Sequence, residues 1–270
     1  MGMPAPLFPL LYKIKHKITF PKTTCLDAIC CSLIKKPRNK SWFNCKSKEI
    51  FMKKFVISAI AVLISLGCIT TANAAAGDNT FSIGYAQTHS NSLKNGVNLM
   101  CDMMTEFGGH FDDYKDPKGI NFKFRHEFDD HLGLIASLTH TNEKFSGDNF
   151  GQDPDSYGYL SAKRRYFSFM AGPTLRLNEY VSAYATAGVA YTKANLYGAE
   201  YSAKKDASDN ITGYDVVNSL ALSDHKTSFA YGIGLQFNPF ESVAIDVSYE
   251  GSGSGDWRTN GFNVGVGYKF

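Results

Sequence analysis

The residues Gly261-Phe262-Asn263-Val264-Gly265-Val266-Gly267-Tyr268-Lys269-Phe270 close the chain. From Phe262 onward, every even position is large and apolar or aromatic, and every odd position is small or polar. This two-residue period is typical of a β-strand with one apolar face. A final aromatic residue in register with that face favours a barrel that is closed by its own last strand.

The amino-terminal quarter of the chain has a different composition. Residues 1–51 contain ten Lys or Arg, two acidic residues and four of the six cysteines. Residues 52–74 then combine two lysines, an apolar run and Ala72-Asn73-Ala74, which are the three parts of a secretory signal peptide. Because such a signal normally begins a protein, we interpret 1–51 as an upstream extension translated in error, 52–74 as the signal peptide, and 75–270 as the exported domain.

The net charge depends on where the exported domain begins. The whole chain carries a formal charge of +3, but without residues 1–74 it has 16 basic and 23 acidic residues, a charge of −7. Nucleic acid is therefore not an expected partner, since binding it requires a basic surface. Cys101 is the only cysteine left, which excludes a disulfide within residues 75–270.

Eight alternating segments follow Asn79, and no amphipathic helix is expected among them. Each has roughly the 9 to 11 residues that a tilted strand needs to cross a bilayer. Their connections alternate between short and long, and this is typical of outer-membrane barrels. The short connections are Asp129-Asp130-His131, Asn178-Glu179-Tyr180 and Asn238-Pro239-Phe240-Glu241, and the long ones cover about 90–117, 144–162, 194–226 and 251–260.

A soluble barrel such as a lipocalin would have strands of similar length. The placement of polar and aromatic residues therefore has to distinguish a soluble barrel from a membrane barrel. A soluble barrel buries its apolar face, whereas a membrane barrel turns that face outward. Tyrosines at 85, 191, 231, 249 and 268 lie towards strand ends, where membrane barrels carry interfacial aromatic girdles. We therefore predict an all-β fold: an eight-stranded antiparallel transmembrane β-barrel with short periplasmic turns and long extracellular loops, in the outer membrane of a Gram-negative bacterium.

In such a barrel the charged face of the strands points inward. An eight-stranded barrel is only wide enough for its own side chains, so we predict an interior polar network rather than a proton or ion path. No spacing of Ser, His and acidic residues marks a catalytic site, and no catalytic, cofactor-binding or metal-binding residue is predicted. The predicted network consists of Lys123, Arg125, Glu127, Arg176, Asp246 and Glu250.

Several motifs resemble one known family when taken in order along the chain. The clearest are Gly84-Tyr85-Ala86-Gln87, the stretch from Tyr231 to Pro239, and Gly265-Val266-Gly267-Tyr268-Lys269-Phe270. They resemble the Ail/Lom/OmpX/PagC family of enterobacterial outer-membrane proteins, and the resemblance covers residues 79–270. It implies an eight-stranded outer-membrane barrel, with Tyr268 and Phe270 as a signal for outer-membrane assembly. In this family, some members mediate adhesion, invasion or serum resistance, and others support survival inside macrophages.

Three groups of residues in the expected loops, or where a loop enters a strand, are candidate contacts. Lys163, Arg164 and Arg165 would meet lipopolysaccharide phosphates or a sulfated host polymer, or would form a solvated rim. Trp257 and Arg258 are residue types favoured at binding hot spots, although Trp257 would also suit an interfacial girdle. The third loop would contact a protein partner, or would simply be mobile. Its tyrosines are Tyr197, Tyr201 and Tyr214.

The sequence thus predicts a non-enzymatic outer-membrane barrel whose extracellular loops mediate a virulence-related host interaction. The expected partners are outer-membrane lipid, lipopolysaccharide, and host-surface or complement-regulatory proteins. Two alternatives remain open: an envelope-integrity protein without a host partner, and a barrel enzyme that modifies lipid A.

Overall fold

We describe the fold from a computed structural model, which defines residues 77–106, 108–149 and 155–270. The predictions of an upstream extension at 1–51 and a signal peptide at 52–74 lie outside these residues. Within them, no helix combines the length and the apolar character required to cross a membrane.

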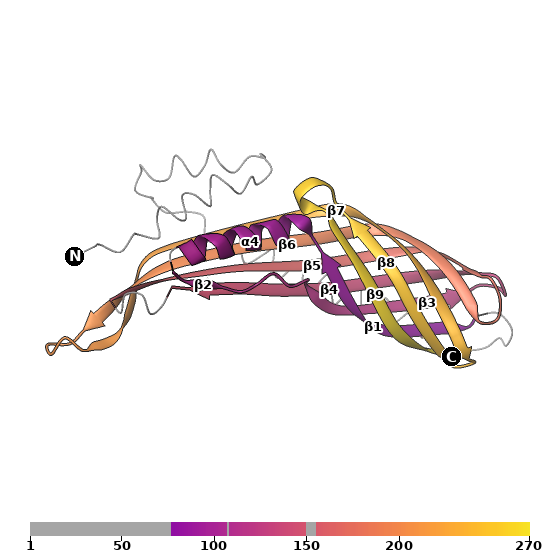
Figure 1. Cartoon of the computed structure of the whole chain (residues 1–270). Coiled ribbons are helices and arrows are strands. Elements are labelled where there is room, and N and C mark those ends of the chain that lie inside the picture. The colour runs from indigo at the N-terminus through magenta and orange to yellow at the C-terminus, as the bar shows by residue number, and fades with distance from the viewer. Residues whose placement is uncertain (1–76, 107, 150–154) are drawn as a thin grey trace, which may run out of the picture.

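Eight antiparallel strands form a closed ring (Figure 1). Strands that follow one another in the chain are neighbours around the ring, and β9 closes it by pairing with β1. A short additional strand, β2 (His110–Phe111), extends the edge of β4. The predicted eight-stranded barrel is therefore confirmed. The ring strands are β1 (Asn79–His89), β3 (Lys118–Glu127), β4 (Leu132–Asp148), β5 (Ser156–Arg176), β6 (Val181–Lys205), β7 (Ile211–Phe240), β8 (Val243–Ser252) and β9 (Thr259–Lys269).

The carboxyl-terminal strand closes the barrel as its alternation predicts. Its register with β1 runs from Thr80 opposite Lys269 to His89 opposite Asn260. Beyond the ladder, Asn79 and Phe270 exchange two backbone hydrogen bonds of 2.8 Å. Phe270 is thus hydrogen-bonded directly to the first residue of β1.

The two faces of the barrel wall differ sharply in polarity. Inward positions hold buried polar side chains, whereas outward positions carry exposed apolar ones. A water-soluble barrel would have the opposite arrangement. We call this outer surface the apolar band; its exposed members include Phe81, Ile83, Tyr85, Ile120, Leu134, Leu175, Val189, Phe229, Tyr231, Ile233, Leu235, Ile245, Val247, Tyr249, Phe262, Val264 and Val266.

The short turns at one end of the barrel use the same local chemistry. In the connection between β3 and β4, Asp129 Oδ1 accepts hydrogen bonds from the backbone N–H groups of His131 and Leu132. Between β5 and β6, Asn178 Oδ1 does the same for Tyr180 and Val181. Asp and Asn favour such turns because their short side chains can satisfy the backbone locally.

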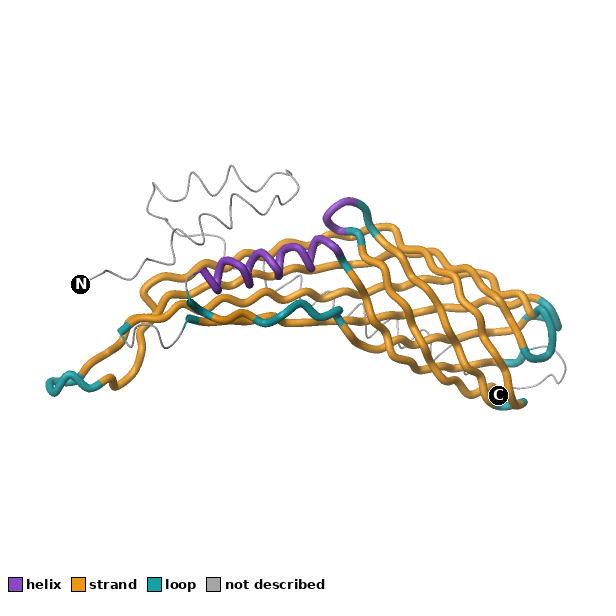
Figure 2. The backbone as a smooth tube through the Cα atoms, in the orientation of Figure 1, coloured by secondary structure: helices purple, strands orange, loops and turns teal. Residues whose placement is uncertain are grey.

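The strands have two very different lengths. Strands β8, β9, β1 and β3 have 10 or 11 residues, whereas β4, β5, β6 and β7 have 17, 21, 25 and 30. The long strands continue beyond the ring as one sheet, which Figure 2 shows reaching away from the barrel. We call this sheet the arm; it consists of residues 143–148, 156–164, 194–205 and 211–224. Most of the predicted loops at 144–162 and 194–226 are therefore strands.

The first long connection contains a helix, so the expectation of no amphipathic helix is wrong. Helix α4 (Asn91–Glu106) lies along the arm (Figure 1). Its buried residues Val97, Met100 and Met104 recur at spacings of three and four, the period of one helix face. They pack with Met103 against Phe111, Phe145, Leu160, Ala162 and Leu196, and we call this apolar cluster the arm core.

Candidate functional site

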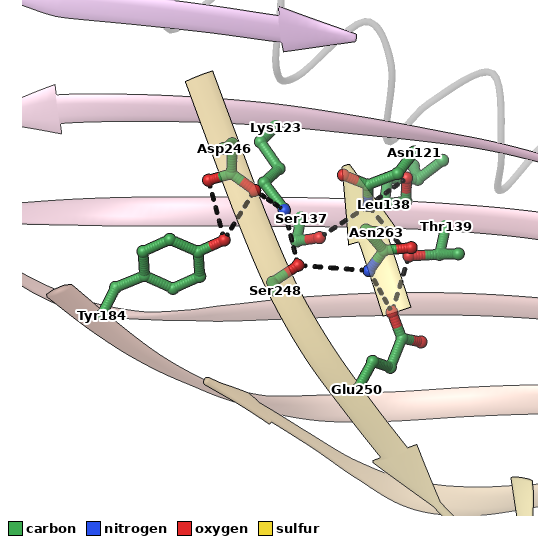
Figure 3. Close-up of polar contacts among 10 residues, drawn as sticks. All are labelled: Asn121, Lys123, Ser137, Leu138, Thr139, Tyr184, Asp246, Ser248, Glu250 and Asn263. Atoms are coloured by element: carbon green, nitrogen blue, oxygen red, sulfur yellow. Dashed lines mark hydrogen bonds and ion pairs between the residues drawn. The ribbon is translucent and has the colours of Figure 1, made fainter. Parts of the chain in front are cut away.

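The barrel interior contains a polar network centred on β8 (Figure 3). Lys123 Nζ forms an ion pair with Asp246 and donates a hydrogen bond of 2.7 Å to Ser248 Oγ. Tyr184 donates its hydroxyl hydrogen to the same carboxylate, lying 2.9 and 2.8 Å from its two oxygens. A Cβ at Gly234 would overlap the Tyr184 ring, so this glycine makes room for that contact.

Glu250 is the second anionic centre of the interior. Its carboxylate accepts hydrogen bonds from Thr139 at 2.7 Å and from Tyr166 at 2.5 Å. Ser168 and Asn263 donate two more. Four donors leave this buried carboxylate well satisfied, as a charge removed from water must be. The arrangement is that of a packed interior.

A third group of charges lies towards the end with the short turns. Arg125 Nη2 lies 2.6 Å from Glu127 Oε1, and Arg176 forms an ion pair with the other oxygen of Glu127. Lys269 Nζ lies 2.5 Å from Asp78, which also approaches Arg176. All six residues predicted for the interior network therefore participate in polar contacts inside the barrel. Tyr166, Tyr184 and Asp78 were not predicted, although both tyrosines have the inward parity of their strands.

The structure separates the predicted basic cluster at 163–165. Arg164 points inward, is 6% exposed, and donates hydrogen bonds to Ser90 Oγ at 2.7 Å and Thr259 Oγ1 at 2.8 Å. Lys163 and Arg165 lie on the opposite face of β5 and are partly exposed. The prediction that these three side chains form one surface cluster is wrong, because alternate residues of a strand point to opposite faces.

The outward pair belongs to a larger basic surface. Lys163 is opposite Lys144 of β4, and Arg165 is opposite Lys193 of β6. We call these four side chains the basic belt. They lie directly beyond the apolar band, since the next outward residue of β5 towards the turns is Phe167. The lysine and arginine side chains therefore mark the margin of the apolar band on the side of the arm.

The arm carries a group of outward-facing tyrosines beyond the basic belt. The rings of Tyr157 and Tyr201 stack with centroids 4.6 Å apart, and Tyr214 contacts Tyr157 edge-on at 5.0 Å. Tyr197 lies 6.3 Å from Tyr159, whose hydroxyl accepts a 3.0 Å hydrogen bond from Lys144 Nζ. The three tyrosines predicted as loop residues are thus on paired strands, and they form part of a tyrosine patch.

Trp257 does not present its ring at the surface. It is 7% exposed and belongs to the single-turn helix η1 (Gly255–Trp257), while Arg258 is exposed. Positive φ angles at Gly253 and Gly255 turn this connection back on itself. Asp256 of η1 accepts a 3.2 Å hydrogen bond from Ser92 at the start of α4. Trp257 as an exposed partner contact is therefore a wrong prediction, because the ring is buried in the fold.

Within the part of the chain that the structure describes, the arm has one backbone edge without a neighbouring strand. Among the described residues, β7 pairs on both sides only from Ala230 onward, whereas residues 211–229 pair with β6 alone. The carbonyl oxygen of Phe229 accepts a hydrogen bond from Gly253, which lies on the side away from β6. In an antiparallel strand, the backbone N–H and C=O groups of alternate residues point to opposite sides. The odd-numbered residues from 219 to 227 therefore point their N–H and C=O groups to the same side as Phe229, which is the open edge.

The other edge of the arm is covered. Strand β2 pairs with Gly147 and Asp148 of β4, and Asp112 bonds the backbone of Ser146. The described part of the chain contains no group of three His, Cys, Asp or Glu residues suited to hold a metal ion. Its most distinctive surfaces are the open edge of β7, the basic belt and the tyrosine patch.

Comparison with known proteins gives consistent matches. A family model described as Enterobacterial Ail/Lom protein matches residues 52–270. The outer membrane protein lom of Escherichia phage lambda is 39% identical, with 80% of this chain and 98% of the relative covered. The virulence membrane protein PagC of Salmonella typhimurium is 33% identical, and the attachment invasion locus protein of Yersinia pseudotuberculosis is 32% identical. These alignments cover 81% and 82% of this chain and the whole of each relative.

Among solved structures, the crystal structure of Ail from Yersinia pestis in complex with the heparin analogue sucrose octasulfate is 31% identical, with a TM-score of 0.48. The alignment covers 72% of this chain and 99% of that protein. Relatives named outer membrane proteins confirm the predicted location of the barrel.

Proposed function

Because this chain belongs to the Ail/Lom family of enterobacterial outer-membrane barrels, we propose that it is a non-catalytic attachment protein that contacts other cell surfaces through its arm. The family is linked to virulence, and the relatives include proteins named for attachment and invasion. The observation that carries the proposal is the open edge of β7. It lies on the outer side of the membrane, because the short turns at the opposite end are periplasmic.

An open edge can bind an extended segment of a partner protein as an additional strand. Ser219, Ala221 and Ser223 direct backbone groups to the edge of β7, and their side chains are small and exposed. A partner strand would therefore meet little steric obstruction there. His225 limits the accessible stretch, because its backbone N–H already donates to Asp224 Oδ1 at 2.7 Å.

The basic belt supports a second contact, with lipopolysaccharide. Lys144, Lys163, Arg165 and Lys193 are adjacent on three strands at the margin of the apolar band. Phosphate groups of the outer leaflet suit guanidinium and ammonium donors at this height. Such contacts would fix the arm relative to the membrane and leave its open edge free.

A proline at Ala221 tests the role of the edge. Its backbone N–H faces away from β6, so proline would remove one donor for a partner while leaving the β6 ladder intact. In a non-adherent host strain, Ala221→Pro should reduce attachment to epithelial cells roughly tenfold, as expected for one lost intermolecular backbone hydrogen bond. The matched control is Ala221→Val, which keeps the N–H.

Surface amounts of both variants are equalised by immunoblotting of intact cells. Equal attachment by the proline and valine variants would reject edge pairing. If the wild-type protein gives no attachment at all but restores outer-membrane resistance to detergent, the envelope-integrity alternative replaces the proposed function. Unchanged lipid A masses in cells with and without the protein are expected for a non-catalytic barrel.

A further inference from the structure

His89 is at the junction between the barrel and α4. It is the last residue of β1, whose outward residues towards the periplasm are Gln87 and then Tyr85 of the apolar band. His89 therefore lies outside the membrane-spanning part of the strand. Asn91, two residues later, begins α4.

Both nitrogens of the His89 ring face oxygen atoms. Nδ1 lies 2.7 Å from Asp116 Oδ1, and Nε2 lies 3.0 Å from Asn91 Oδ1. A neutral imidazole carries one N–H, whereas an imidazolium carries two. With Asn91 presenting its carbonyl oxygen, only the protonated ring can donate to both acceptors at once, so this geometry is complementary to the charged form.

Asp116 connects this histidine to the rest of the junction. Its carboxylate also accepts hydrogen bonds from Tyr114 at 2.7 Å and Gln87 at 2.9 Å. The Tyr114 ring stacks on Phe145 of the arm core at 5.9 Å. The contacts of His89 thus join the end of β1, the start of α4 and the segment before β3 that contains Tyr114 and Asp116.

The charges around His89 come from several elements. Asp116 of the segment before β3 is the nearest anion, and Tyr114 of the same segment lies 3.4 Å from Nδ1. The positive charge of Lys94 in α4 opposes protonation of His89. Lys118 of β3 is paired with Gln87, which lies two residues before His89 in β1. In β9, the residue paired with His89 is the uncharged Asn260. The single-turn helix η1 contains Asp256, which accepts a hydrogen bond from Ser92 of α4. Asp116 is the group in direct contact, and it favours the protonated ring.

We propose that His89 and Asp116 form a pH-dependent clasp that holds α4 against the arm when His89 is protonated and loosens it when His89 is neutral. The clasp would make the arm a tighter structure in mildly acidic surroundings than in neutral or alkaline ones. It acts on the helix and the arm core, and it does not depend on which partner the open edge binds.

The direction of the effect follows from linkage. The hydrogen bond from His89 to Asp116 raises the pKa of His89 above its ordinary value of 6.5. A group with a raised folded-state pKa contributes stability that is complete below the unfolded-state pKa and disappears as the pH rises through the folded-state pKa. Docking of α4 should therefore be strongest below about pH 6.5 and should weaken above it.

Hydrogen exchange of α4 tests the clasp. The protein is taken from outer membranes into nanodiscs, and exchange of residues 91–106 is followed by mass spectrometry at pH 5.5 and 8.0, corrected for the intrinsic rate. In the wild type, the protection of α4 should fall about three- to tenfold between the two pH values, because a partly exposed pair contributes modestly. His131→Gln, in an exposed periplasmic turn, should behave like the wild type.

Two variants of His89 separate titration from simple damage. His89→Gln should show the same low protection at both pH values. His89→Lys keeps a positive charge opposite Asp116 throughout this range and should show high protection at both. A wild-type helix whose protection does not change with pH would overturn the proposal. So would a wild-type pH response in either variant, because another group would then be responsible.

Discussion

Neighbouring residues of one strand have different roles in this barrel wall. Arg164 is buried between Ser90 and Thr259, whereas Lys163 and Arg165 face outward beside the apolar band. Three consecutive basic residues in the sequence indicate a single cluster, but strand geometry divides them. Parity along β5, anchored on Phe167 and Phe169, was sufficient to predict this division.

Single substitutions should separate the two roles. Arg164→Gln should lower the stability of the outer end of the barrel by about 1–3 kcal/mol, because two buried hydroxyl groups lose a charged donor. Arg165→Gln should leave stability nearly unchanged and weaken binding to lipopolysaccharide. Thermal unfolding in detergent and binding to immobilised lipopolysaccharide would measure these effects. The assignment fails if Arg164→Gln alone reduces binding while stability is unchanged.

Burial of individual residues was predictable where it follows from alternation. Lys123, Arg125, Glu127, Asp246 and Glu250 all have inward parity, and all are buried. The burial of Trp257 has another origin. It depends on a tight turn at Gly253 and Gly255 and on the position of α4, and no periodicity within the fourth connection reveals this contact between distant segments.

At the level of elements, the strands were easier to predict than their lengths. The apolar alternation marks the membrane-spanning part of each strand, since lipid selects the outward residues there. Beyond the membrane, outward residues face water and become polar or aromatic, as at Ser161 and Tyr159. The apolar signal therefore ends although the backbone pairing continues.

Helix α4 was missed for a related reason. Leu93, Val97, Met100 and Met104 have helical spacing, but the first turn has no acidic residue, the last turn has no basic residue, and Gly96 lies between them. Such a helix is marginal by itself, because its stability comes from the surface on which it packs. That surface is the inner face of the arm, and it exists only once β4, β5 and β6 have paired.

Truncation of Met104 should release the helix from the arm. Met104 is 1% exposed in the arm core, so Met104→Ala should weaken docking of α4 by about 2–3 kcal/mol, near the lower end for buried Met-to-Ala changes. Hydrogen exchange of residues 91–106 should then accelerate roughly 30-fold or more. Asn98→Ala, on the exposed side of the helix, should have little effect. Equal exchange in the two variants would contradict the packing argument.

At the level of the whole molecule, the last ten residues predict the closing contact between the first and the last strand of the barrel. The alternation of Phe262, Val264, Val266 and Tyr268 specifies a strand with a lipid-facing side, and β9 is that strand. The pairing of β9 with β1 follows, because a transmembrane sheet cannot leave an edge unpaired in lipid. Which connection carries the arm was not predictable in this way.

Removal of Phe270 should impair assembly of the barrel. The deletion breaks the two backbone hydrogen bonds with Asn79. It also removes an exposed aromatic ring at the periplasmic end of the barrel. The folded fraction in outer membranes, measured by the heat-dependent gel shift, should fall several-fold, whereas Phe270→Tyr should assemble normally. Normal assembly of the deletion variant would show that closure by β9 does not need its last residue.

The graded lengths of the four long strands also determine how far the protein reaches. Adding one residue to each strand of the terminal hairpin between β6 and β7 would extend the arm by about 3.3 Å and leave every lipid-facing residue in place. Reach and membrane insertion can therefore change independently. Paired insertions at 206–210 would thus move the tip of the arm farther from the lipid, with no change in the barrel.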